Sequence, residues 1–194
     1  YKLSDADEND TWAIIARDYL EYHRAVDPDS YPFMLSHKSS NRYMDKWIGR
    51  IIIPIYKQNT LIFYQGRDLT GKRKKKYESA STVKDKVLYG FDNLANINNT
   101  GPIYIVEGFF DAYAIDGVAI LGNELSPQQI ERLNNSKRDK VYIPDRIGDG
   151  QVGAHKALNL GWYVSTPDIG NCKDMSEAVK KYGKLYTMRT LIEE

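Results

Sequence analysis

The N-terminal half of the sequence combines one amphipathic helix with a short β-rich region. Between residues 12 and 20 the hydrophobic side chains recur every three or four positions, which predicts a helix that ends near Val26. Residues 50–56 and 60–64 are rich in β-branched and aromatic side chains, and three polar residues separate them. This spacing predicts a β-hairpin, in which Pro54 must lie at a sheet edge or at a bulge.

The C-terminal half shows a different pattern, in which short apolar runs alternate with helical segments. The runs lack polar alternation, as in strands that are covered on both faces, and they span residues 102–106, 118–121, 141–144 and 162–165. Such alternation predicts right-handed crossovers and a doubly wound sheet. We therefore expect an α/β fold with a Rossmann-like, mainly parallel sheet flanked by helices, preceded by an α+β N-terminal subdomain.

Helix boundaries in this half are marked by side chains that cap helices. Ser126 and Gln129, with a proline directly after the serine, are typical of a helix start with a capping box. Asp174 and Glu177 suggest a second capping box, and Gly183 is expected to end that helix.

The polar segment 93–101 is expected to separate two subdomains. Residues 1–95 form a basic N-terminal subdomain with a leading acidic helix, and residues 96–194 form the subdomain with the parallel sheet and C-terminal helices. The first residue is Tyr1, so the sequence is compatible with a piece of a longer protein.

Composition narrows the class of protein further. No apolar run approaches the ~20 residues of a membrane-spanning helix, and no secretory segment is evident, so we expect a soluble, cytoplasmic protein. The single cysteine, Cys172, excludes a disulfide within the chain, and three widely spaced histidines make a His-built metal site improbable. Any metal is therefore expected to be a hard cation held by carboxylates.

The formal net charge of +1 conceals a strong asymmetry along the chain. Residues 1–31 carry eight acidic and three basic side chains, whereas residues 67–86 carry eight basic and three acidic ones. The basic stretch predicts a polyanionic partner at one place on the surface, with a solvated loop as the alternative interpretation.

Two acidic residues directly follow predicted strands. Glu107 comes after the strand that ends at Val106, and Asp145 comes after the strand that ends at Pro144. Ligands of open parallel sheets bind at the carboxyl ends of the strands, so we expect these two carboxylates to meet there and to hold magnesium. Further acids nearby also have purely structural explanations, as helix-dipole, turn or N-cap residues; they are Asp111, Asp149 and Asp174.

These residues resemble a known family. Glu107–Gly108, Asp111–Ala112 and the acidic loop after residue 144 are similar to the TOPRIM domain shared by DnaG-type primases, topoisomerases and some nucleases. Upstream, residues 49–55, 66–67, 76–77 and 86–90 resemble the basic N-terminal subdomain of the primase polymerase core. The resemblance covers about residues 45–180 and favours a DnaG-type DNA primase. The compact core and the loose match to the motifs resemble a phage primase more than a bacterial housekeeping one.

The resemblance implies a nucleotidyltransferase that synthesises short RNA primers on single-stranded DNA during DNA replication, with Mg²⁺ or Mn²⁺ as cofactor. Its partners would be the template, ribonucleoside triphosphates, a replicative helicase and a zinc-binding domain outside this chain. The implied catalytic residues are Glu107 and Asp145, and the implied metal ligands are Glu107, Asp145, Asp149 and Asp174. The implied contacts to nucleic acid or nucleotide are Arg50, Arg67, Lys74, Lys75, Lys76, Lys86 and Asp111.

The acidic loop departs from the family pattern at one position. The family has two aspartates there, separated by one residue, and Ile147 occupies the position of the second one here. Isoleucine cannot bind a metal. This departure favours a catalytically weakened nucleic-acid-binding module as the alternative to the primase. A metal-dependent nuclease of the TOPRIM type is a separate, third alternative.

Overall fold

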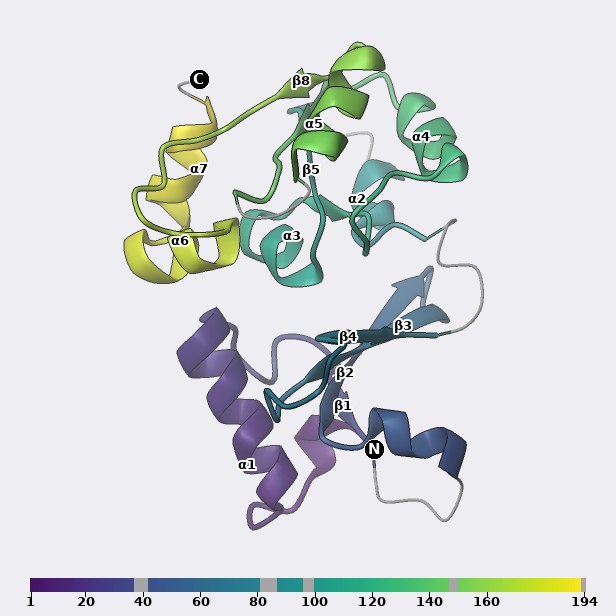
Figure 1. Cartoon of the computed structure of the whole chain (residues 1–194), viewed down its shortest axis with the longest axis vertical. Coiled ribbons are helices and arrows are strands. Elements are labelled where there is room, and N and C mark those ends of the chain that lie inside the picture. The colour runs from purple at the N-terminus through teal and green to yellow at the C-terminus, as the bar shows by residue number, and fades with distance from the viewer. Residues whose placement is uncertain (37–41, 81–86, 96–99, 147–149, 193–194) are drawn as a thin grey trace. The chain divides into compact units, whose positions relative to one another are not determined.

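The computed structural model describes residues 1–36, 42–80, 87–95, 100–146 and 150–192 (Figure 1). The chain forms two compact units, Tyr1–Lys84 and Asp85–Glu194, which are considered one at a time below. The units divide at an earlier point than the subdomain boundary expected after residue 95, and the functional division into those subdomains stays a prediction.

The first unit is a four-stranded antiparallel sheet with helical segments. The strands pair in the order β1-β2-β3-β4. Its elements are η1 (Leu3–Asp5), α1 (Thr11–Asp18), η2 (Tyr19–Arg24), β1 (Met34–Leu35), η3 (Arg42–Trp47), β2 (Arg50–Lys57), β3 (Thr60–Asp68) and β4 (Tyr77–Ser79). The N-terminal helix is confirmed: α1 continues as the π-helical turn η2, and Ala25 ends it in the left-handed conformation with φ 51°.

The predicted hairpin is confirmed as β2 and β3. Gln58 and Asn59 form its turn with positive φ angles of 48° and 61°. Pro54 pairs with Tyr64 of β3, while β1 reaches only Ile51 and Ile52 on the other side of β2. Pro54 therefore lies beyond the short neighbouring strand and next to the register shift at Ile55, as a residue without an N–H requires.

The second unit is the expected parallel α/β sheet. Its elements are α2 (Phe91–Ala95), β5 (Ile103–Val106), α3 (Phe109–Ile115), β6 (Val118–Ala119), α4 (Pro127–Asn134), β7 (Lys140–Tyr142), α5 (Gly150–Asn159), β8 (Tyr163–Val164), α6 (Met175–Tyr182) and α7 (Lys184–Ile192). The strands lie in the order β6-β5-β7-β8, and every neighbouring pair is parallel. The fold class and its mainly parallel sheet are confirmed.

Helices cover both faces of this sheet, which explains why its strands lack polar alternation. Figure 1 shows α4 and α5 on one side of the strands and α3, α6 and α7 on the other. On the first side, side chains of the sheet pack with Leu133 of α4 and Ala157 of α5 in one buried cluster. On the second side, α3 contacts β5 and β6 and packs against α6 and α7.

The predicted helix starts are also found. Ser126 accepts a hydrogen bond from the backbone N–H of Gln129, whose side chain in turn accepts from the backbone N–H of Ser126, which completes the capping box. Asp174 caps α6 through the backbone N–H of Glu177 at 2.8 Å. The Glu177 carboxylate accepts from Lys173 instead of Asp174, so the second box is only half formed.

Gly90 shows where this fold requires glycine. Its φ is +77°, and a Cβ atom added there would lie 2.6 Å from the carbonyl oxygen of Gly117. The neighbouring Tyr89 pairs with Ala119, which extends the sheet beside β6. A side chain at position 90 would therefore separate this segment from the strand.

Within the described parts of the chain, no helix combines the length and apolarity needed to cross a lipid bilayer.

Candidate active site

The topology places Glu107 and Asp145 at the carboxyl ends of adjacent strands. The chain passes from β5 to β6 on one side and later returns to β7 on the other side of β5. Glu107 directly follows β5, whereas Asp145 comes three residues after the end of β7. The order of the strands reverses between β5 and β7, and this is the position where open α/β sheets bind their ligands.

Tyr142 of β7 contacts Glu107 at the end of the neighbouring strand. The Tyr142 ring is fully buried, and its hydroxyl donates a hydrogen bond of 3.3 Å to Oε1 of Glu107. Burial raises the pKa of Tyr142, and the nearby carboxylates of Glu107 and Asp145 raise it further. The hydrogen bond fixes the Glu107 carboxylate at the end of β5, next to the strand that Asp145 follows.

Gly153 of α5 makes room for this tyrosine. A Cβ atom added at Gly153 would lie 2.7 Å from Cζ of Tyr142 and closer still to its hydroxyl oxygen. Any other residue at position 153 would therefore displace the Tyr142 ring or the helix. The sequence analysis assigned no role to Tyr142 or Gly153, because their contact arises only when α5 packs on β7.

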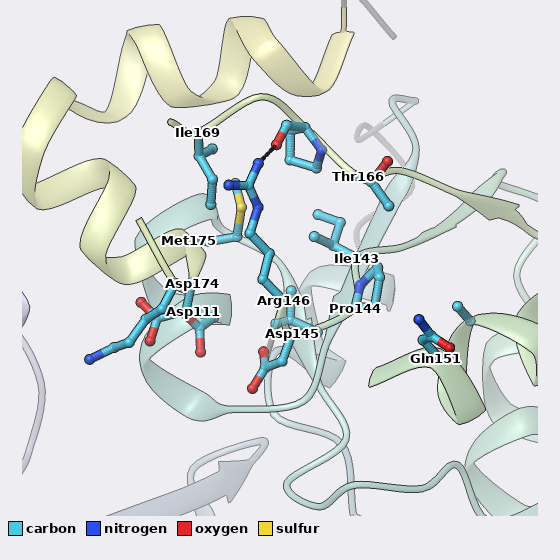
Figure 2. Close-up of a pocket in the computed structure, with 14 residues that line it drawn as sticks. Asp111, Ile143, Pro144, Asp145, Arg146, Gln151, Thr166, Ile169, Asp174 and Met175 are labelled. Carbon is cyan, nitrogen blue, oxygen red and sulfur yellow. Dashed lines mark hydrogen bonds between the residues drawn. The ribbon is translucent and has the colours of Figure 1, made fainter. Parts of the chain in front are cut away.

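A pocket of about 250 Å³ lies beside these strand ends. Figure 2 shows residues from the ends of β5 and β7, from α3 and α5, and from the segment leading into α6. Three acids contribute to its lining, namely Asp111, Asp145 and Asp174. Glu107 is absent from the lining, although it hydrogen-bonds to the tyrosine of the adjacent strand.

Asp111 is buried and supports the backbone of the next helix. Its Oδ1 atom accepts a hydrogen bond of 2.9 Å from the backbone N–H of Ser176, at the start of α6. The side chain is only 8% exposed, so Asp111 joins α3 to α6 beneath the pocket. The contact to nucleic acid or nucleotide that the resemblance implied for Asp111 stays a prediction beside this structural role.

Arg146 holds the acidic loop against the segment that leads to α6. Its guanidinium donates hydrogen bonds to the carbonyl oxygens of Gly170 at 2.6 Å and Pro167 at 2.7 Å. One of these bonds is visible in Figure 2. Sequence reasoning missed this residue, because its partners lie more than 20 positions away and follow no motif.

The carboxylates suit a divalent cation of the magnesium type. Mg²⁺ retains several waters and typically binds one or two protein carboxylates together with phosphate oxygens. Asp145 and Glu107 supply such oxygens, whereas Oδ1 of Asp174 is occupied as the cap of α6. In the parts of the chain that are described, no three acidic, cysteine or histidine side chains gather around one point. Asp149 and Ile147 lie outside the described residues.

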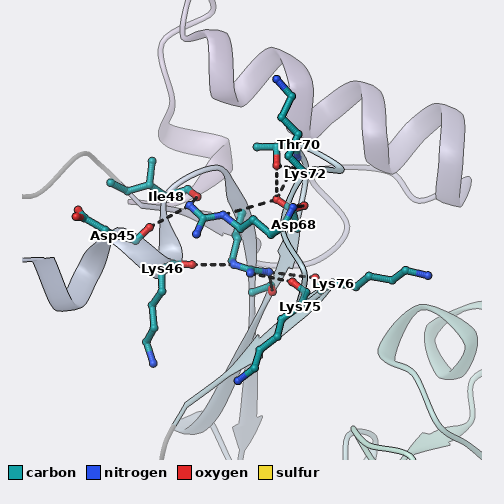
Figure 3. Close-up of polar contacts among 11 residues, drawn as sticks. Asp45, Lys46, Ile48, Asp68, Thr70, Lys72, Lys75 and Lys76 are labelled. Carbon is teal, nitrogen blue, oxygen red and sulfur yellow. Dashed lines mark hydrogen bonds and ion pairs between the residues drawn. The ribbon is translucent and has the colours of Figure 1, made fainter.

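In the first unit, the predicted basic residues divide into supporting and exposed ones (Figure 3). Arg50 is 2% exposed, and its guanidinium donates to four backbone carbonyls, those of Lys46, Gly66, Lys75 and Lys76, over 2.8–3.1 Å. Four of its five N–H donors are therefore engaged. The structure gives Arg50 the role of a support for the loop before β4, and its predicted phosphate contact stays a prediction.

Asp68 and Arg73 fix the other end of this loop. Asp68 accepts from the backbone and hydroxyl of Thr70 and from the backbone N–H of Arg73. Burial alone would raise the pKa of Asp68, but these hydrogen bonds and the nearby Arg50 hold it below its usual range. The Arg73 guanidinium donates to the carbonyls of Asp45 and Ile48.

The lysines between these anchors face the solvent. Lys74, Lys75 and Lys76 are exposed on a loop whose backbone is held by Arg50 and Arg73. Exposed cations on a fixed loop can contact a polyanion at little cost in backbone entropy. Lys86 falls outside the described residues.

Arg67 differs from both groups. Its guanidinium carbon lies 5.0 Å from the ring centre of Tyr77 and 5.7 Å from that of Tyr19. The Nε atom is buried and has no hydrogen-bond partner among the described residues. A cation held by rings, without a counter-ion from the protein, is suited to bind an anion.

Comparison with known proteins shows that the chain is similar in sequence to DNA primases. A DNA primase of Thermotoga maritima is 30% identical over 164 residues, which cover 76% of this chain and 29% of the relative. A DNA primase of Enterococcus faecalis is 27% identical over 168 residues, covering 75% of this chain and 27% of the relative. The chain thus spans less than a third of these curated relatives. No family model matches it.

Solved structures show the same fold. A DnaG catalytic core covers 95% of this chain and 74% of its own length, with a TM-score of 0.74 and 21% identity. A DnaG catalytic domain bound to single-stranded DNA covers 95% of this chain and 73% of its own length, with a TM-score of 0.73 and 19% identity. An Aquifex aeolicus primase with zinc-binding and RNA polymerase domains covers 92% of this chain and 46% of its own length, with a TM-score of 0.66 and 23% identity.

Proposed function

Because the chain has the fold of a DnaG-type primase core and is related in sequence to DNA primases, we propose that it is the nucleotidyltransferase core of a primase. It would synthesise short RNA primers on single-stranded DNA. The observation that carries this proposal is the position of Glu107 and Asp145 at the strand reversal between β5 and β7. The fold alone would not suffice, since one fold hosts many functions.

The chemistry assigned to the acids is nucleotidyl transfer. The 3′-hydroxyl of the growing primer attacks the α-phosphate of a ribonucleoside triphosphate, a new phosphodiester bond forms, and pyrophosphate leaves. Glu107 accepts the proton of the attacking hydroxyl or holds it in line, and the hydrogen bond from Tyr142 fixes its carboxylate. Asp145, with Asp149 and Asp174 as further candidates, would hold Mg²⁺ or Mn²⁺, which neutralises charge on the triphosphate when bound.

The basic surface of the first unit would position the nucleic acid. Lys74, Lys75 and Lys76 are exposed on a supported loop, and Arg67 and Lys86 are further candidates for phosphate contacts. Contacts of this kind fix the position of a nucleic-acid backbone without reading its sequence. Nothing in them favours a particular template sequence.

Partners beyond template and nucleotides follow from the relatives. One structural relative carries a zinc-binding domain beside its polymerase domain. We propose that such a domain and a replicative helicase act with this core in the cytoplasm, either on the same polypeptide or on another. The phage-like character stays a prediction.

A catalytically weakened nucleic-acid-binding module is the second candidate. It is favoured by Ile147, which occupies the position of the second aspartate in the acidic loop. A metal-dependent nuclease is a third candidate, and it would cleave DNA in the presence of the metal.

The decisive assay measures RNA synthesis on a single-stranded DNA template with labelled ribonucleotides and Mg²⁺ or Mn²⁺. The parent protein should give template-dependent oligoribonucleotides, and Glu107→Gln should lower the rate by about 100-fold or more. Glu124→Gln, at an exposed position of the same unit, is the matched control. Normal DNA binding without product from the parent protein would favour the binding module, and cleaved DNA would favour the nuclease.

A further inference from the structure

Arg67 is an unusual arginine in the first unit. Arg50 and Arg73 donate to backbone carbonyls, and Arg24 donates to the hydroxyl of Tyr19. Within the described residues, the side chain of Arg67 has neither a hydrogen bond nor an ion pair, and its Nε is buried. Burying such a donor without an acceptor costs free energy, so the position needs an explanation.

Two tyrosines hold the guanidinium. Tyr77 is the cross-strand neighbour of Arg67 in the β3–β4 pair, and its ring centre lies 5.0 Å from the guanidinium carbon. Tyr19 approaches from the N-terminal helical segment, with its ring centre 5.7 Å away. Both distances are within the ~6 Å over which a cation is attracted to an aromatic face.

Tyr19 is itself held in place. Its hydroxyl accepts a hydrogen bond of 2.8 Å from Nε of Arg24, and its ring stacks on His23 at 5.7 Å between ring centres. Tyr19 is also the first residue of the π-helical turn η2. Such turns are rare and occur frequently at functional sites.

We propose that Tyr19 and Tyr77 form an aromatic clamp that positions Arg67 to bind a phosphate group of the nucleic acid or of the incoming nucleotide. The N-terminal helical segment, although acidic overall, thereby contributes Tyr19 to the binding surface. The clamp adjoins the exposed lysines, since Tyr77 directly follows Lys76. The choice of ligand rests on the proposed function, whereas the clamp itself rests on the contacts of Arg67.

Aromatic rings suit this task better than a carboxylate partner would. A carboxylate would neutralise Arg67 and compete with phosphate, whereas a ring restricts the guanidinium and leaves its charge intact. The restriction also reduces the conformational entropy lost when the phosphate binds.

The test compares Tyr19→Leu, which removes the ring, with Tyr19→Phe, which keeps it. Affinity for a labelled single-stranded DNA oligonucleotide is measured by fluorescence anisotropy, and KM for ribonucleotides is measured in the synthesis assay. Tyr19→Leu should weaken one of these constants about threefold to tenfold, and Tyr19→Phe should change it less than about twofold. A change in DNA affinity would assign the phosphate to the nucleic acid, and a change in KM would assign it to the nucleotide.

A double-mutant cycle separates positioning from a general loss of structure. In an Arg67→Met background, Tyr19→Leu should have no further effect on that constant. The NMR signal of the Arg67 Nε–H should be displaced by the aromatic rings in the parent protein and in Tyr19→Phe. It should return toward its ordinary position in Tyr19→Leu.

The outcomes distinguish the two proposals. Two results would overturn the clamp and leave the primase proposal intact. In one, Tyr19→Leu has the DNA affinity and the KM of the parent protein. In the other, Tyr19→Leu weakens binding as much in the Arg67→Met background as in the parent protein. A parent protein that binds neither single-stranded DNA nor ribonucleotides would overturn the proposed function and the phosphate ligand together.

Discussion

The two compact units use charged residues in different ways. In the first unit, the buried arginine of the sheet binds carbonyls of its own chain, and the lysines beside it remain exposed. In the second unit, the acids follow the ends of parallel strands, where the topology itself gathers them. The difference shows that topology can point to candidate catalytic residues, whereas a surface cation can be recognised only when the partners of each basic residue are known.

The largest expected effect in this comparison is at Arg50. Replacing it by methionine removes four hydrogen bonds to backbone carbonyls, one of them fully buried, which should destabilise the first unit by about 3 kcal/mol or more. Urea unfolding measures the change, with Lys74→Met on the exposed side of the same loop as the control. Equal stability of the two variants would contradict the supporting role of Arg50.

The next effect concerns Tyr142, which donates a hydrogen bond to Glu107. Gly153→Ala should lower the free energy of unfolding by about 1–3 kcal/mol, because the new methyl group clashes with the Tyr142 ring. RNA synthesis should fall as well, since the hydroxyl moves away from Glu107. In a Tyr142→Val background, Gly153→Ala should hardly change the stability, because the ring is gone. If thermal unfolding shows the same loss of stability in that background, the contact with the Tyr142 ring is not the cause.

Asp174 allows its cap and its charge to be separated. Asp174→Ala should destabilise α6 by about 1 kcal/mol, whereas Asp174→Asn keeps a capping oxygen and should remain close to parental stability. If Asp174 also holds the metal, Asp174→Asn should still raise the Mg²⁺ concentration needed for synthesis. An unchanged Mg²⁺ dependence would restrict Asp174 to its cap.

The smallest effect is expected for single lysines of the basic loop. Lys74→Ala or Lys75→Ala should change stability by less than about 0.5 kcal/mol. Each should also reduce the slope of log affinity against log salt by about one, because one phosphate contact is lost. A slope identical to that of the parent protein would remove that lysine from the interface.

Much of the fold could be predicted from local sequence. The hairpin turn, the caps at Ser126 and Asp174 and the parallel strands depend on nearby residues and on patterns that a short segment already contains. The position of Glu107 and Asp145 at strand ends followed from the same patterns.

Other parts of the site depend on contacts between distant segments. Asp111 bonds to Ser176, 65 positions away, and Arg50 bonds to carbonyls up to 26 positions away. The fit of Gly153 to Tyr142 likewise depends on how a helix packs on a strand. No local pattern distinguishes such residues from a surface acid, a phosphate-binding arginine or an ordinary helix glycine.

The most direct test of the central claim is a double-mutant cycle of Glu107→Gln and Asp145→Asn in template-dependent RNA synthesis. If the two carboxylates serve one site, each substitution should lower the rate by about 100-fold or more, and the double variant should lose little beyond either single variant. Binding of single-stranded DNA should remain near the parental level in all three. Losses that multiply, or a substitution without effect, would show that these strand ends do not form one catalytic site.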